Sequence, residues 1–273
     1  MRLIALTTAI LIAITAHPQS YHELIAEGTK KMELGDTETA IKSYNKAIAL
    51  EPDNKKNEFI YANLALAYEK CNNEEKAEEM YDKALSFNPK SPRLLQQRGN
   101  MFLRTDKWDK ALADYDSIIV NEPFNEEALY FRAYIYSEKK KYEKAYEDYY
   151  RILTVNPENH KTRFALALLL HKHKKSEEAL LTLDVLIEKN PDNPEYYLTC
   201  SDIAKSQKRE ELALVYIEEG LSKCNKKKAL YTEKARLLIT ANRKDEARSI
   251  LNQLIKEGGN SYEINSLYNK TTH

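Results

Sequence analysis

The amino-acid sequence predicts an all-helical protein, folded as a solenoid of antiparallel helix pairs. Its composition favours helix over sheet, because Gly (6) and Pro (8) are scarce among 273 residues while Lys, Glu, Ala and Leu are common. The chain also repeats itself with a period of 34 residues, which is typical of stacked helix–turn–helix units. Finally, the 19 tyrosines are more than active sites require and indicate a recurring packing position.

The first segment of the chain differs from the rest. An apolar run of about 14 residues, Leu3–Ala16, follows Arg2, which suits a signal peptide and is short for a membrane span of about 20 residues. We expect residues 1–16 to be a signal peptide and the protein to be exported, to a bacterial periplasm or outside the cell. Ile14 is large for the third position before a cleavage site, so an uncleaved membrane anchor is the alternative.

The repeat is visible when windows of 15 residues are aligned. Five windows share Ala at the third place and Pro at the last: 38–52, 75–89, 109–123, 143–157 and 177–191. The corresponding prolines are Pro52, Pro89, Pro123, Pro157 and Pro191, with spacings of 37, 34, 34 and 34. Windows 211–225 and 245–259 continue in phase without the proline. The chain is therefore predicted to be a tandem array.

Residues 58–91 show why one repeat forms two helices. One apolar face has helical spacing and comprises Tyr61, Leu64, Ala65 and Tyr68. After the polar stretch "EKCNNE", a second such face comprises Ala77, Tyr81, Ala84 and Leu85. Pro89 then ends the second helix, because proline cannot continue the helical hydrogen bonds.

Small residues recur where the two helices of each unit must approach closely. At the eighth place stand Gly28, Ala65, Gly99, Ala133, Ala167, Ser201 and Ala235. At the twentieth place stand Ala40, Ala77, Ala111, Ala145, Ala179, Ala213 and Ala247. With these residues, and with Tyr44, Tyr81, Tyr115 and Tyr149 at the twenty-fourth place, the chain resembles a tetratricopeptide-repeat (TPR) array. Its seven units are 21–54, 58–91, 92–125, 126–159, 160–193, 194–227 and 228–261.

The ends of the array depart from the repeat. The first unit carries Glu27 and Lys31 on its apolar face, which an end unit tolerates because it lacks one neighbour. Residues 262–273 follow the last unit and carry Ile264, Leu267 and Tyr268 on one stripe, so they are expected to form a C-terminal capping helix.

The resemblance implies a right-handed superhelix whose first helices line a concave groove for a protein or peptide partner. Polar groove places are predicted on the second to third units and aromatic ones on the fourth and fifth. The predicted groove residues are Asn63, Arg93, Gln96, Gln97, Asn100, Arg104, Tyr130, Phe131, Tyr134, Lys161 and Phe164. The alternatives are a membrane-tethered organiser of an envelope complex, if residues 3–16 are retained, and an accessory protein that binds a small ligand such as a glycan.

Motifs for chemistry are absent from the sequence. No phosphate-binding Gly-rich loop, GxSxG or HExxH is present, and the three cysteines form no CxxC pair. His171 and His173 in "HKHKK" point apart on a helix, so they cannot share a metal. The 42 basic and 42 acidic residues balance, which gives no support for nucleic-acid binding. We therefore expect no enzymatic activity, no cofactor and no nucleic-acid partner.

The triplet "DYD" at 114–116 could suggest a metal site, but Asp114 and Asp116 diverge on a helix. Arg98 lies sixteen residues before Asp114, and the next unit repeats this spacing with Arg132 and Asp148. The spacing predicts an ion pair between the two helices of each unit, with a role in packing. Asp116 is expected to be solvated.

Overall fold

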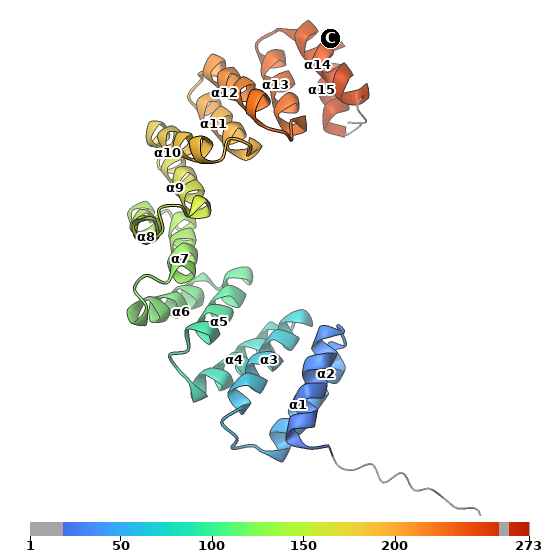
Figure 1. Ribbon diagram of the computed structural model, residues 1–273, viewed down its shortest axis with the longest axis vertical. Coiled ribbons are helices and arrows are strands. Elements are labelled where there is room, and N and C mark those ends of the chain that lie inside the picture. The colour runs from blue at the N-terminus through green and yellow to red at the C-terminus, as the bar shows by residue number, and fades with distance from the viewer. Residues whose placement is uncertain (1–18, 257–261, 273) are drawn as a thin grey trace, which may run out of the picture. The chain divides into compact units, whose positions relative to one another are not determined.

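The structure is a computed structural model that describes residues 19–256 and 262–272 of the 273-residue chain. Within this part every regular element is an α-helix, and consecutive helices pack in antiparallel pairs (Figure 1). The predicted fold class, an all-helical array of helix pairs, is confirmed. The predicted signal peptide (1–16) and the end of the seventh predicted unit (257–261) lie outside the described residues.

The chain divides into two compact units, of which the first ends at Asn121. We call it the N-terminal unit. It contains three helix pairs: α1 (Tyr21–Glu33) with α2 (Thr37–Leu50), α3 (Asn57–Lys70) with α4 (Glu74–Phe87), and α5 (Pro92–Arg104) with α6 (Trp108–Asn121).

The C-terminal unit begins at Glu122. It contains four pairs and a final helix: α7 (Glu126–Glu138) with α8 (Tyr142–Val155), α9 (His160–Lys172) with α10 (Ser176–Lys189), α11 (Pro194–Ser206) with α12 (Glu210–Lys223), α13 (Lys228–Thr240) with α14 (Lys244–Lys256), and α15 (Tyr262–Thr272).

Local sequence explains where the first helix of many pairs begins. The Ser20 side chain accepts a hydrogen bond from the Glu23 amide, and the Glu23 carboxylate accepts one from the Ser20 amide, which forms a capping box. Asn125 caps α7 through the amide of Ala128 at 3.0 Å. These caps satisfy amides that have no partner inside the helix.

A left-handed residue makes the turn inside every pair. The positive-φ residues of the described chain all stand at the fifteenth place of their unit: Gly35, Asn72, Asp106, Lys140, Lys174, Lys208 and Asn242. A left-handed residue directly after a helix reverses the chain and frees it to begin the next helix. The same backbone geometry at the same place explains why the pairs are alike.

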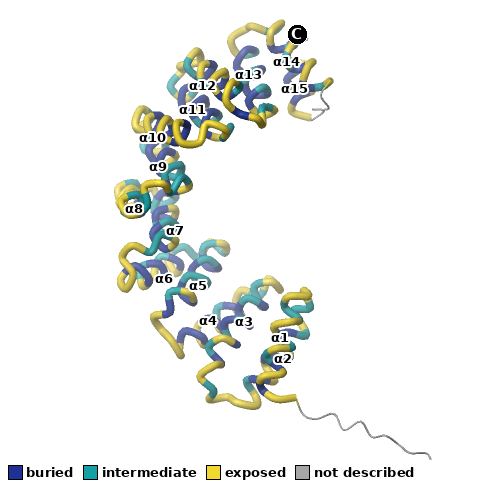
Figure 2. Tube along the Cα trace, viewed as in Figure 1, coloured by how far each residue is buried: buried dark blue, intermediate teal, exposed yellow. Residues whose placement is uncertain are grey.

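The core runs between the helices of each pair (Figure 2). The alanines at the twentieth place are fully buried, and they are Ala40, Ala77, Ala111, Ala145, Ala179, Ala213 and Ala247. Close approach is most stringent at Gly28, where an added Cβ would lie 2.6 Å from a ring carbon of Tyr44. Small residues therefore let a buried tyrosine of the second helix lie directly beneath the first helix.

The last helix, α15, covers the end of the C-terminal unit by packing on α13 and α14. Ile264 and Leu267 are 1 % and 5 % exposed, so they form its buried stripe. Arg248 of α14 donates to the carbonyl oxygen and the hydroxyl of Thr271, near the end of α15. These contacts cover a face of α14 with the last described helix.

Candidate functional site

The polar residues predicted for the groove lie on the first helices α3 and α5 of the N-terminal unit. We call them the polar patch, and none of them is buried: Asn63, Arg93, Gln96, Gln97, Asn100 and Arg104. Arg93 lies over the ring of Phe59, with 5.6 Å between the guanidinium carbon and the ring centroid, and Phe59 is 57 % exposed. The patch therefore presents charge and apolar area together.

A core tyrosine orients the centre of the polar patch. The buried Tyr115 of α6 donates its hydroxyl hydrogen to Asn100 Oδ1 at 2.8 Å. Gln96 Nε2 donates to the same oxygen at 3.0 Å. The Asn100 side-chain oxygen thus accepts two hydrogen bonds, which fix the orientation of the amide. The NH₂ group of Asn100 points away from these two donors and can donate to an acceptor on a bound partner.

A second core tyrosine fixes an acidic residue on α3. Tyr81 donates to Glu69 Oε1 at 2.6 Å, and Arg104 pairs with the other oxygen of this carboxylate. Burial, followed by the bond to Glu69, raises the pKa of Tyr81. The core thus sets the side-chain geometry on the accessible face, and Arg104 is partly neutralised by Glu69.

Gln97 is the unsatisfied member of the polar patch. Its Oε1 atom is inaccessible to solvent and has no hydrogen-bond partner in the described part of the chain. An orphaned acceptor costs about 1–3 kcal/mol, so such groups call for an explanation. A donor supplied by a bound chain, after rotation of the Gln97 amide, would relieve this cost.

The aromatic residues predicted for the groove, together with Lys161, lie on α7 and α9 of the C-terminal unit. We call these five residues the aromatic patch: Tyr130, Phe131, Tyr134, Lys161 and Phe164. Lys161 Nζ lies 4.0 Å from the Tyr130 ring centroid and 5.5 Å from that of Phe131. Tyr134 is 42 % exposed, whereas Tyr130 packs against the buried Tyr149. Tyr134 and Lys161 are thus the exposed residues of this patch.

The structure brings Arg98 and Asp114 together. Arg98 Nε and Nη2 donate to Asp114 Oδ2 and Oδ1 at 3.0 and 2.6 Å, a bidentate pair between α5 and α6. Arg132 and Asp148 repeat this geometry between α7 and α8 at 2.8 and 2.6 Å. Both aspartates are 2 % exposed.

Two details were not expected from sequence. Arg98 also pairs with Asp82 of α4, so its guanidinium joins two neighbouring helix pairs. Asp116, expected to be solvated, is half-buried instead and interacts with other residues of the chain.

A charged network on α11, α13 and α15 was missed at the sequence level. Lys205 Nζ bonds the buried Glu233 at 2.5 Å, and Arg236 pairs with both Glu233 and Glu263. Burial opposes the charge of Lys205, but Asp202 and Glu233 raise its pKa overall. The groove residues were selected from the second, fifth, sixth, ninth, twelfth and thirteenth places of the first helices. Lys205, Glu233 and Arg236 stand at the twelfth, sixth and ninth places of their units, so extending the selection to the last two units would have found them.

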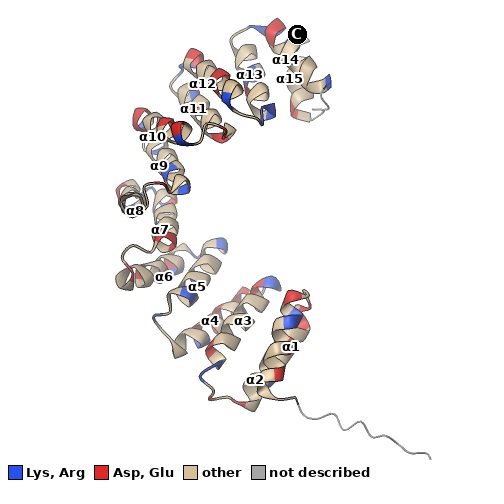
Figure 3. Ribbon diagram, viewed as in Figure 1, with Lys and Arg blue, Asp and Glu red and all other residues tan. Residues whose placement is uncertain are grey.

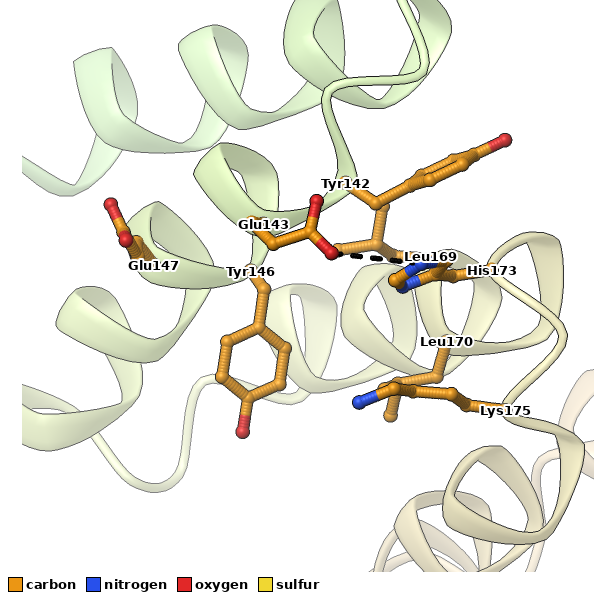
Figure 4. Close-up of a pocket in the computed structure, with 8 residues that line it drawn as sticks. All are labelled: Tyr142, Glu143, Tyr146, Glu147, Leu169, Leu170, His173 and Lys175. Carbon is orange, nitrogen blue, oxygen red and sulfur yellow. Dashed lines mark ion pairs between the residues drawn. The ribbon is translucent and has the colours of Figure 1, made fainter.

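Figure 4 shows a pocket of about 210 Å³ that lies between α8 and α9. The His173 ring stacks on Tyr142 with 4.7 Å between centroids, and its Nε2 lies 3.6 Å from the Glu143 carboxylate. The "HKHKK" segment lies at the turn between α9 and α10: His171 and Lys172 end α9, and residues 173–175 lead to α10. His173 packs against Tyr142 of the neighbouring helix.

No arrangement of the described residues suggests metal chemistry or a membrane span. Within residues 19–256 and 262–272, no three His, Cys, Asp or Glu side chains are grouped so that they could hold a metal ion. Among the helices described, none combines the length and the apolar character that crossing a membrane requires. The accessible features are polar and aromatic side chains on helix faces.

Four family models, described as tetratricopeptide repeat or TPR repeat, match residues 28–72, 59–91, 97–154 and 136–203. Photosystem I assembly protein Ycf3 of Synechococcus sp. strain CC9902 is 32% identical over 100 residues, which are 37% of this chain. The chain spans only 56% of the length of that relative.

Solved structures of tetratricopeptide-repeat proteins have a fold similar to that of this chain. A tetratricopeptide-repeat protein from Parabacteroides merdae is 25% identical, with a TM-score of 0.68 over 94% of this chain and 100% of that one. YrrB, described as a TPR protein with an unusual peptide-binding site, is 19% identical, with a TM-score of 0.54 over 68% of this chain and 94% of YrrB. With about seven helix pairs and repeat matches along most of its length, the chain belongs to the tetratricopeptide-repeat proteins.

Proposed function

We propose that the protein is a non-enzymatic scaffold that binds a protein or peptide partner on the faces of its first helices. The observation that carries this proposal is the polar patch, where the core tyrosine Tyr115 orients the amide of Asn100 and the Oε1 atom of Gln97 lacks a hydrogen-bond partner among the described residues. An extended peptide offers the alternating N–H and C=O groups that such amides pair with.

The aromatic patch supports the same proposal in the C-terminal unit. An exposed tyrosine beside a lysine offers contact area at a low entropic cost, and tyrosine is enriched among residues that dominate binding energies. YrrB, whose description names a peptide-binding site, shares the fold and extends the expectation of peptide binding to this chain.

Site-specific photocrosslinking tests the proposal. A photoreactive amino acid placed at Gln97 or at Tyr134, in the chain expressed in its native host, is expected to capture a protein in stoichiometric amounts. Ser117 is the control position, because it is exposed on the second helix α6 of the same unit as Gln97. Equal capture from Ser117 and Gln97, or no capture from either patch, would contradict binding on the first helices.

We also propose that the protein is exported to the periplasm or the cell exterior. The apolar run Leu3–Ala16 after Arg2 supports this, and the expected cleavage follows Ala16. N-terminal sequencing of the protein recovered from its host checks the proposal. A mature chain beginning just after Ala16 would agree with it, whereas an intact N-terminus in the membrane fraction would favour an anchor.

A further inference from the structure

The surface formed by α11, α13 and α15 has a pocket of about 740 Å³. Its volume lies within the range of about 300–1,000 Å³ that is usual for ligand sites. Its apolar lining comes from Leu198 of α11, Ala229 of α13 and Ile264 of α15, and its rim carries the three consecutive lysines Lys226, Lys227 and Lys228. We call these three residues the lysine rim.

The acidic residues of the pocket are already paired. Glu233 is 5 % exposed and is bonded by Lys205 and Arg236, and Glu263 is bonded by Arg236 as well. Their negative charge is therefore neutralised inside the network, and little of it remains for the lysine rim.

The lysine rim is free of ion pairs within the described part of the chain. Asp192 lies near Lys226, whose charge contributes to lowering the pKa of Asp192. However, the Asp192 oxygens are engaged by the amide and the side chain of Asn225, at 2.6 and 2.7 Å. The three lysines thus remain available to a bound anion at the edge of the pocket. Figure 3 marks the Lys and Arg positions of the described chain in blue.

We propose that this pocket binds an acidic segment of a partner protein, with carboxylates on the lysine rim and an apolar side chain on Leu198 and Ala229. The inference rests on the proposed function as a peptide-binding scaffold, and it assigns a partner chemistry to a surface outside the polar and aromatic patches. The mixed lining favours a peptide over a nucleic acid, because a polyphosphate has no apolar group to cover the apolar part of the lining.

A synthetic peptide of alternating Glu and Leu, labelled with fluorescein, is the probe, and anisotropy with the full chain is the measurement. The variant Lys226→Gln, Lys227→Gln, Lys228→Gln is expected to bind the peptide about tenfold more weakly, since three exposed ion pairs are lost together. The matched control is Lys139→Gln, Lys140→Gln, Lys141→Gln, another run of three lysines, at the turn between α7 and α8. Its affinity is expected to change less than about twofold.

A further variant and a second probe distinguish binding of an acidic peptide from binding of other ligands. Ala229→Asp adds a negative charge at the exposed edge of the pocket and is expected to weaken binding without affecting the fold. Equal loss in the two lysine variants, or no binding by the unmodified chain, would overturn the proposal, as would tighter binding of an oligonucleotide with the same charge. Capture from Gln97 and Tyr134 in the lysine-rim variant reports on the scaffold function separately, so the two proposals can fail independently.

Discussion

At the scale of single residues, Arg98 is informative because its two carboxylate partners differ in environment. The Asp114 side chain is 3 % exposed, whereas the Asp82 side chain is 57 % exposed. A buried carboxylate has no water to replace its lost partner, but an exposed one is solvated again when its ion pair is broken. The two contacts therefore contribute unequally, although one guanidinium makes both.

We predict that Asp114→Asn lowers the free energy of unfolding by about 2–3 kcal/mol, because Arg98 loses its buried bidentate partner. Asp82→Asn is expected to cost no more than about 1 kcal/mol. Urea denaturation of both variants measures the difference. Similar losses in the two variants would show that burial does not decide the strength of these pairs.

The three cysteines make a second residue-scale prediction. Cys71 is exposed, whereas Cys200 and Cys224 are 0 % and 2 % exposed. Burial raises the pKa of both buried thiols, so they form less of the reactive thiolate at any given pH. Iodoacetamide at mildly alkaline pH is expected to label one cysteine in the folded protein and all three in denaturant, as counted by mass spectrometry. The Cys71→Ser variant should then resist labelling while folded, and rapid labelling of that variant would contradict the buried state of the other two.

At the scale of elements, the left-handed turn residue is placed by the repeat and not by local preference. Gly, Asn and Asp tolerate positive φ, and they fill this place in the first three units and in the last. Lys140, Lys174 and Lys208 fill it in the others, at φ values near 60°: 58°, 62° and 60°. A β-carbon in this region is strained by roughly 1 kcal/mol, so the packing of the helix pair imposes the turn on these lysines.

Replacing one of these lysines by glycine is therefore expected to stabilise the protein. Lys174→Gly should raise the free energy of unfolding by about 0.5–1 kcal/mol, because the released strain exceeds the added entropy of the unfolded chain. Lys175→Gly is the matched control, since Lys175 has φ −97° and no strain to release. Thermal denaturation measures the change in stability of the two variants. Equal stabilisation of both would attribute the effect to the lost positive charge and not to backbone strain.

The repeat explains how much could be predicted from the sequence. Helix pairs follow from periodic small and apolar residues, which each unit repeats, and the Arg98–Asp114 contact follows from a spacing within one unit. The contacts of Arg98 with Asp82 and of Arg236 with Glu263 join different units or the final helix, so no spacing inside a unit reveals them. The tyrosine hydroxyls that orient Asn100 and Glu69 were likewise hidden, because tyrosine at a core place predicts packing but not the direction of its hydroxyl.

At the scale of the whole molecule, the two compact units are built from short-range contacts. Inside each unit the substantial contacts join helices that are neighbours in the chain or next neighbours, such as α1 with α3 and α13 with α15. In such repeat architectures, stability is approximately a sum over repeats and the interfaces between adjacent ones. A loss of packing in one repeat should therefore lower the stability of that repeat and its neighbours before that of distant repeats.

A matched pair of core deletions tests this expectation. Leu64 of α3 and Leu230 of α13 are both 0 % exposed, and truncating either to alanine is expected to cost about 2–5 kcal/mol locally. Because coupling passes only between adjacent repeats, Leu64→Ala should reduce hydrogen-exchange protection in the N-terminal unit and leave that of α11–α15 almost unchanged, while Leu230→Ala should do the reverse. Hydrogen exchange read by mass spectrometry resolves the helices separately. If either variant lowered protection equally in both units, the chain would unfold as one cooperative block, and additive repeat energetics would not apply to it.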